Sequence, residues 1–167
     1  MDVKKFSTQF IVRTLTASDV PQIYELCKGN PLYYEHCPPF VSEESIRKDM
    51  AALPPHKTME DKFYVGYFDG NKLIAVLDLI RGFPDKATVF IGFFMINIAM
   101  QHKGIGTKII DDLCLLYLRQ QGYSHIRLSW VKGNPQAEHF WHKNGFIETG
   151  VTSQTENYTM IFAQRDL

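Results

Sequence analysis

The chain has 167 residues, and its 18 Lys and Arg balance 18 Asp and Glu, so its formal net charge is zero. A chain of this length predicts one domain, spanning residues 1–167, that can bury about two-thirds of its unfolded surface without disulfides or structural metal. The balanced charge argues against a nucleic-acid-binding protein or a polybasic membrane-surface protein, because both carry a basic excess.

The cysteines and the N-terminal residues bear on the compartment. Three cysteines, without a C-x-x-C pair, support neither a disulfide framework nor a cysteine zinc site, and they favour a reduced, cytoplasmic setting. Residues 1–10 are interrupted by charges and have no apolar core, so we expect no signal peptide. The nearly uncharged run at 87–100 is too short to span a bilayer and predicts a buried strand.

The first part of the chain predicts a strand and a helix. Residues 10–15 have the composition of a strand. Thr16, with Asp19 three residues later, marks a helix start, and apolar residues then recur at helical spacing. A Gly-Asn-Pro sequence at 29–31 ends this helix.

A second helix and three strands follow. Residues 32–41 are expected to be irregular, and the Ser-Glu-Glu sequence at 42–44 caps a short helix that a Pro-Pro pair terminates. Strands are predicted at 63–68, 72–81 and 87–96, separated by turn sequences rich in Gly, Asp, Asn and Pro.

The last part of the chain alternates helices and strands. Residues 106–121 predict an amphipathic helix with Ile109, Leu113 and Leu116 on one stripe, and 124–131 predicts a half-buried strand.

The next helix has well-defined ends. It is capped by Asn134, continues with Pro135 and is closed by Gly145, and two strands at 146–150 and 158–164 follow it. The element order is therefore strand, two helices, three strands, helix, strand, helix and two strands, a mixed α/β domain around one sheet.

A glycine-containing turn precedes the long helix and predicts an anion site. Its residues are Gln101, His102, Lys103, Gly104, Ile105, Gly106 and Thr107. The two glycines allow close backbone approach, and the first helix amides lack intrahelical partners. Lys103 and Lys108 add positive charge in an otherwise neutral protein. Phosphate groups are the expected ligand.

Two nucleotide-binding patterns fail in this turn. The Walker pattern fails on its spacing, and the dinucleotide pattern needs a third glycine where Ile109 stands. A plain glycine-rich connection between a strand and a helix remains an alternative to an anion site.

Two motifs in this order resemble those of the GNAT N-acetyltransferases. The first is Gln101-x-x-Gly104-x-Gly106 after an apolar strand. The second combines Asn134 and Ala137 with the aromatic pair Phe140-Trp141 and the dipeptide Gly145-Phe146. The order of predicted elements over residues 10–163 also fits that family. The resemblance implies a central, mostly antiparallel sheet with helices on both faces.

The resemblance also implies a reaction, the transfer of an acetyl group from acetyl-CoA to a primary amine by direct attack on the thioester, without a metal. Residues 101–107 would hold the CoA pyrophosphate. The backbone of Met95, Ile96 and Asn97 would pair with the pantetheine arm, and an N–H near Ile96 could stabilise the oxyanion. Asn134 would bond the pantetheine, or act only as a helix cap. Phe140 and Lys143 would lie near the far end of the cofactor.

The general acid and base are harder to assign. Trp141 stands where many family members have a tyrosine acid, and an indole N–H cannot serve as an acid, so we expect Trp141 to pack in the core. Asp78 lies within an apolar run and is a candidate general base. A solvent-facing or hydrogen-bonded strand residue is the alternative for Asp78.

The acceptor site is expected on the segment between the first two helices. Tyr33, Tyr34 and Glu35 could bind an amine there, although a plain surface loop is equally compatible with these residues. Further acidic candidates are Glu43 and Glu44. His139 and His142 lack a third ligand, so no metal is expected.

Two rival functions stay open. One is an acyl-CoA-binding sensor or pseudoenzyme, motivated by Trp141 and by the absence of a carboxylate in strand 87–96. The other is a nucleotide-phosphate binder. We expect acetyl-CoA and an amine as partners, neither nucleic acid nor membrane, and a monomer or homodimer.

Overall fold

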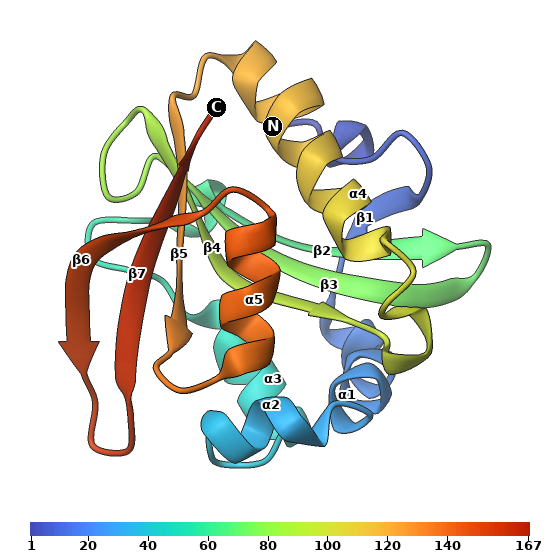
Figure 1. The fold of residues 1–167 in the computed structure, drawn as a ribbon. Coiled ribbons are helices and arrows are strands. Elements are labelled where there is room, and N and C mark those ends of the chain that lie inside the picture. The colour runs from blue at the N-terminus through green and yellow to red at the C-terminus, as the bar shows by residue number, and fades with distance from the viewer.

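The computed structural model describes residues 1–167 and contains a seven-stranded sheet in the order β1-β2-β3-β4-β5-β7-β6 (Figure 1). The strands are β1 (Ile11–Thr14), β2 (Lys62–Asp69), β3 (Lys72–Arg81), β4 (Thr88–Ile96), β5 (His125–Val131), β6 (Ile147–Gln154) and β7 (Thr159–Asp166). All neighbouring strands are antiparallel except β4 and β5, which are parallel. The predicted mixed α/β fold with a mostly antiparallel sheet is confirmed.

Helices cover both faces of this sheet. They are α1 (Val20–Lys28), α2 (Pro31–His36), α3 (Glu43–Ala51), α4 (Ile105–Asp111) and α5 (Pro135–Lys143). One apolar cluster joins Ile23 of α1 and Ile46 of α3 to Met95 of β4. A second cluster joins Ile109 of α4 and Trp141 of α5 to the other face of the sheet. No helix of the structure combines the length and the apolar character that a membrane span requires.

The segment 32–41 was expected to be irregular throughout, but α2 occupies its first half. Asn30-Pro31 ends α1, and Pro31 then stands at the first position of α2. Proline suits that position because its fixed φ is helical and its missing N–H would have had no partner. The Asn30-Pro31 dipeptide therefore follows the end of α1 and also begins α2, so Tyr33 and Tyr34 lie on a helix.

The helix expected at 106–121 is continuous but not regular. After α4, a π-helical segment spans Asp112–Leu118, and a 3-10 turn spans Arg119–Gln121. A π-helix has more residues per turn than an α-helix, so the buried stripe shifts along the sequence. Tyr117 is buried, whereas Leu116 is 47% exposed. The prediction that Leu116 faces the core was wrong for this reason.

Candidate active site

The parallel strands β4 and β5 separate halfway along their length. Residues 88–91 of β4 pair with 125–128 of β5, and no pairing follows. Beyond that point β5 stays with β7, and β4 stays with β3. The C-terminal half of β4 therefore has a strand neighbour on one side only.

Backbone direction decides which β4 groups face the gap between β4 and β5. The Asn97 N–H donates to Ile74 O of β3 at 2.8 Å. Along a strand, the backbone N–H and C=O of successive residues point alternately to one side and to the other. Met95 and Asn97 therefore direct their backbone groups to β3, and Phe94 and Ile96 direct theirs to the gap. Of the three residues expected to offer an open edge, only Ile96 does so, and Phe94 was not among those expected.

Gln101 fastens the glycine-containing turn to three elements. Its Nε2 donates to Asn30 Oδ1 at 2.6 Å and to Ile96 O at 3.2 Å, and its Oε1 accepts from Gln136 Nε2 at 3.2 Å. The buried Asn30 also donates to Ile96 O at 3.2 Å. The Gln101 side chain is thus engaged in holding the turn, and Ile96 keeps only its N–H free.

The turn leaves a row of backbone donors without protein partners. The first hydrogen bond of α4 runs from Lys108 N–H to Gly104 O at 3.0 Å, so the N–H groups of residues 105–107 have no acceptor. Gly104 has a φ of +76°, in the left-handed region, and a side chain there would meet no atom within 4 Å. His102 also has a positive φ, 59°. The turn therefore presents an open row of amides suited to an anion.

The two lysines of the turn differ in their partners. Lys103 is exposed and donates to Ala99 O at 2.8 Å, with no carboxylate beside it. Lys108 forms an ion pair with the buried Asp112 and also donates to Thr8 Oγ1. Both lysines were expected to add positive charge at the turn, but Asp112 neutralises that of Lys108, so only Lys103 does so.

Gly106 is required for packing. A Cβ on this residue would lie 2.6 Å from Ile96 Cδ1 and 2.9 Å from Phe140 Cε2. The Phe140 ring also stacks on Phe94, with 6.0 Å between ring centroids. The missing side chain at Gly106 lets α4 approach both β4 and α5 closely.

The remaining α5 residues have distinct surroundings. Asn134 is buried, and its Oδ1 caps α5 by accepting from Ala137 N–H at 3.1 Å. Lys143 is exposed at the end of the helix. Trp141 is buried between Phe94 and Phe146, in the core position that we expected.

Asp78 forms a buried ion pair on β3. Its Oδ2 accepts from Lys62 Nζ at 2.7 Å, and Lys62 also donates to Ala52 O at 3.0 Å. The Lys62 and Asp78 side chains are only 1% and 10% exposed. Asp78 Oδ1 is buried and has no hydrogen-bond partner. Burial raises the pKa of the Asp78 carboxyl, and Lys62 opposes that rise only in part.

A β-bulge makes room for this carboxylate. Asp78 pairs with Phe93, but Leu79 pairs with Ile91, so Gly92 is the extra residue of β4. A Cβ on Gly92 would lie 2.7 Å from Asp78 Oδ2. The bulge and its glycine therefore hold Asp78 next to the point where β4 leaves β5.

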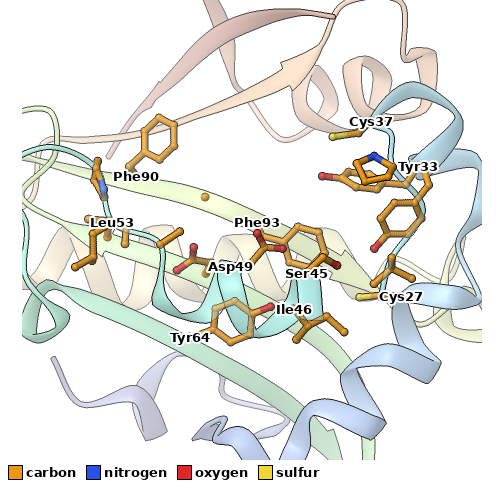
Figure 2. Close-up of a pocket in the computed structure, with 18 of the residues that line it drawn as sticks. Cys27, Tyr33, Cys37, Ser45, Ile46, Asp49, Leu53, Tyr64, Phe90 and Phe93 are labelled. Carbon is orange, nitrogen blue, oxygen red and sulfur yellow. The ribbon is translucent and has the colours of Figure 1, made fainter. Parts of the chain in front are cut away.

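Asp78 lines a pocket of about 430 Å³ between α2, α3 and the sheet (Figure 2). Asp49 of α3 also lines it, and these two aspartates are its only charged lining residues. Tyr33 and Cys37 lie at one end of the pocket in Figure 2, Leu53 and Phe90 lie at the other end, and Asp49 lies between them.

The structure brings some of the expected acceptor residues to this pocket and leaves others out. Tyr33 and Tyr34 line it, and the Tyr33 ring packs edge-on against Phe93 with centroids 5.8 Å apart. Glu35 does not line it. Glu43 and Glu44 are exposed and pair with basic residues of their own helix.

Two functional candidates were missed at the sequence level. Asp49 follows Ser45 by four residues and Ile46 by three, so a helical projection of α3 would have placed it on the inward side. No local pattern identifies Lys62 as the partner of Asp78, because the pair joins two strands.

One histidine of α5 lies in a surface cluster. His142 Nε2 is 3.6 Å from Glu148 Oε1, and one ligand atom from each of Glu138, His142 and Glu148 lies within 4.8 Å of the others. All three side chains are exposed, and the pairing of His142 with Glu148 accounts for the arrangement. His139 is not part of this cluster.

Comparison with known proteins agrees with this geometry. The model of the acetyltransferase (GNAT) family matches residues 22–146. An acetyltransferase from Salmonella typhimurium, described as modifying the N-terminal serine of ribosomal protein L7/L12, superposes with a TM-score of 0.76 at 19% identity over 97% of both chains.

Two further structures share the fold. An acetyltransferase from Thermus thermophilus superposes with a TM-score of 0.75 at 18% identity, over 95% of this chain and 97% of that chain. The PaiA N-acetyltransferase of Thermoplasma acidophilum, solved with coenzyme A, gives 0.64 at 17% identity over 95% and 99%. No curated protein sequence matches the chain. Because the family model covers most of its length, the chain belongs to the GNAT acetyltransferase family.

Proposed function

We propose that the protein is an N-acetyltransferase that moves an acetyl group from acetyl-CoA to a primary amine. The observation that carries the proposal is the separation of β4 from β5 after residue 91. The open β4 edge lies between the free amides of residues 105–107 and the bulge beside Asp78. A phosphate cradle, a strand edge and a proton acceptor then follow one another along a single path.

The residues along this path fit acetyl-CoA. Residues 101–107 would hold its pyrophosphate through backbone N–H groups, assisted by the free charge of Lys103. Phe94 and the Ile96 N–H would pair with the amides of the pantetheine arm, as an added strand pairs with a sheet edge. Asn134, whose side-chain nitrogen donates to no protein group, would bond the same arm.

The far end of the cofactor would lie along α5. Phe140 and Lys143 are the side chains that we assign there. Phe140 is partly buried against the turn and Lys143 is exposed, so the two offer an apolar contact and a positive charge, respectively.

Asp78 is the residue that we assign to proton removal. Acetyl-CoA supplies an activated acyl thioester with a thiolate leaving group. The acceptor ammonium gives one proton to Asp78 Oδ1, its nitrogen bonds to the acyl carbon, the carbon–sulfur bond breaks, and the second nitrogen proton neutralises the sulfur. A carboxylate with a raised pKa accepts a proton more readily than an ordinary one, which favours Asp78 in this role.

The chain also offers donors for the charge that develops on the acyl oxygen. The Phe94 N–H faces the gap beside the bulge and is suited to that position, while the Phe94 C=O and the Ile96 N–H remain for the pantetheine arm. Trp141 contributes no acid, because an indole N–H cannot serve as one, and its ring packs in the core against Phe94. A thiolate with a pKa near 8.5 costs only about 2 kcal/mol to release unprotonated at neutral pH, so no strong acid is needed.

Two measurements test this proposal together. Calorimetry measures binding of acetyl-CoA, and a thiol assay measures CoA release with a panel of primary amines. We expect binding and amine-stimulated release. No binding at millimolar acetyl-CoA would contradict the proposal, and binding without release would identify an acyl-CoA sensor instead.

The three cysteines are free thiols, in keeping with the cytoplasmic location that we propose.

A further inference from the structure

We propose that the acceptor is a small primary amine with a single positive charge and an apolar body the size of an aromatic ring, and that Asp49 and Asp78 bind its ammonium group. This inference rests on the proposed function, because it names the substrate of the same site. It is carried by the charges, the walls and the size of the pocket in Figure 2.

The charge of the pocket calls for one cation. Asp49 and Asp78 are its only charged lining residues, and Lys62 neutralises one of these two charges. The Lys62 ammonium is turned away from a ligand, because it binds Asp78 Oδ2 and Ala52 O and lies 5.6 Å from the Tyr64 ring centre. One negative charge remains, which a monocation balances.

An unsatisfied atom marks where that cation would bind. Asp78 Oδ1 is buried without a partner in a side chain that is 10% exposed. A buried carboxylate oxygen without a donor is costly, and an ammonium group supplies the missing donor. Asp49 lines the same pocket as Asp78, so both carboxylates face the space in which the ammonium group would bind.

The walls of the pocket are mostly aromatic and apolar. The aromatic side chains that line it are Tyr33, Tyr34, Tyr64, Phe83, Phe90 and Phe93. Such rings favour a flat apolar group and also attract a cation to their faces. With Asp49 and Asp78 both engaged by the first ammonium group, the other ammonium groups of a polyamine would find no further carboxylate among the pocket walls.

The volume of the pocket favours a free small molecule. About 430 Å³ falls within the range of about 300–1,000 Å³ for small-molecule sites. A peptide would need backbone partners beyond its first residue. The pocket walls on the side of α2 and α3 offer side chains and not a strand edge. Apart from tyrosines, cysteines and the two aspartates, Ser45 is the only lining residue with a hydrogen-bonding side chain.

The test compares amines that differ in one property at a time. 2-Phenylethylamine is the probe, spermidine adds charge, butylamine lacks the ring, and a serine-initiated peptide carries its amine on a chain. CoA release is measured for each, with binding followed by calorimetry, and 2-phenylethanol serves as the uncharged analogue. We expect kcat/KM for 2-phenylethylamine to exceed that of each other amine about tenfold or more, and 2-phenylethanol to bind at least tenfold more weakly. Preference for spermidine or the peptide would overturn the inference.

Asp49→Asn isolates the second carboxylate. Glu44→Gln is its matched control, because Glu44 is an acidic residue of the same helix that does not line the pocket. We expect Asp49→Asn to raise KM for 2-phenylethylamine about tenfold with kcat changed less than threefold, and Glu44→Gln to change neither. Equal behaviour of the two variants would overturn the role of Asp49.

The outcomes separate this inference from the proposed function. If acetyl-CoA binds but no amine of the panel binds or reacts, the acceptor inference is wrong and the cofactor assignment stands. If acetyl-CoA does not bind but 2-phenylethylamine binds in an Asp49-dependent way, the proposed function is wrong and the pocket assignment stands.

Discussion

Lys62 and Asp78 form an ion pair of 2.7 Å that is almost fully buried, directly beside the bulge where β4 parts from β5. Desolvation of two charges is costly, and their attraction offsets that cost only while both are present. The pair therefore contributes to the stability of the sheet and also holds the proposed base, Asp78, where β4 separates from β5.

Removing one partner should destabilise the fold strongly. We expect Lys62→Met to lower the free energy of unfolding by about 3–5 kcal/mol, because Asp78 is left charged and unpaired. The double variant Lys62→Met/Asp78→Asn should lose less than the sum of the single losses, by about 1–3 kcal/mol. Urea unfolding of the wild type, Lys62→Met, Asp78→Asn and the double variant measures the coupling energy. Additive losses of stability would show that the two residues are not coupled.

The pH dependence should report the Asp78 carboxyl. Burial raises its pKa above that of an ordinary aspartate, and a base acts only when deprotonated. The acid limb of kcat/KM should therefore rise with pH through this raised pKa. Asp78→Asn should remove the limb and lower kcat about 10²–10⁴-fold, if circular dichroism shows the variant folded. A limb that survives in Asp78→Asn would assign it to another group.

Gly104 and Gly106 should respond differently to alanine. Gly106→Ala introduces a Cβ 2.6 Å from Ile96 Cδ1 and should cost about 1–3 kcal/mol of stability. Gly104→Ala meets no atom but strains a φ of +76°, and should cost about 1 kcal/mol. Thermal unfolding of both variants checks the order. A greater loss in Gly104→Ala would show that the packing of α4 on β4 is not the constraint.

Reversing the free charge of the turn should weaken cofactor binding. Lys103→Glu should raise the Kd for acetyl-CoA about three- to tenfold at low salt and less at high salt. Arg119→Glu makes the same charge change on an exposed residue at the far end of the helical run, and should leave the Kd unchanged. Equal changes of the Kd in the two variants would mean that the net charge of the protein, and not the position of Lys103 in the turn, governs cofactor binding.

Elements with strong local signals were predictable from the sequence. Asn134, Pro135 and Gly145 mark the ends of α5 correctly, since capping depends on a few neighbouring residues. The strand β3 was expected over its full length. By contrast, two features could not be predicted from local sequence. Asn30-Pro31 both follows the end of α1 and begins α2, and the π-helical segment moves the buried stripe away from Leu116.

The site was predictable only where it is local. The turn at 101–107 is contiguous, so its free amides follow from the sequence. Asp78 was a candidate because it stands in an apolar run, but its partner Lys62 comes from a neighbouring strand. The direction of the β4 backbone depends on pairing with β3, so Phe94 could not have been chosen over Met95.

A calorimetric titration of the intact protein with acetyl-CoA is the sharpest test of the proposed cofactor site. The separation of β4 from β5 and the free amides of residues 105–107 predict one binding site per chain. We expect a 1:1 isotherm that Lys103→Glu weakens and Arg119→Glu does not. The absence of any binding at millimolar acetyl-CoA would contradict the assignment of this site.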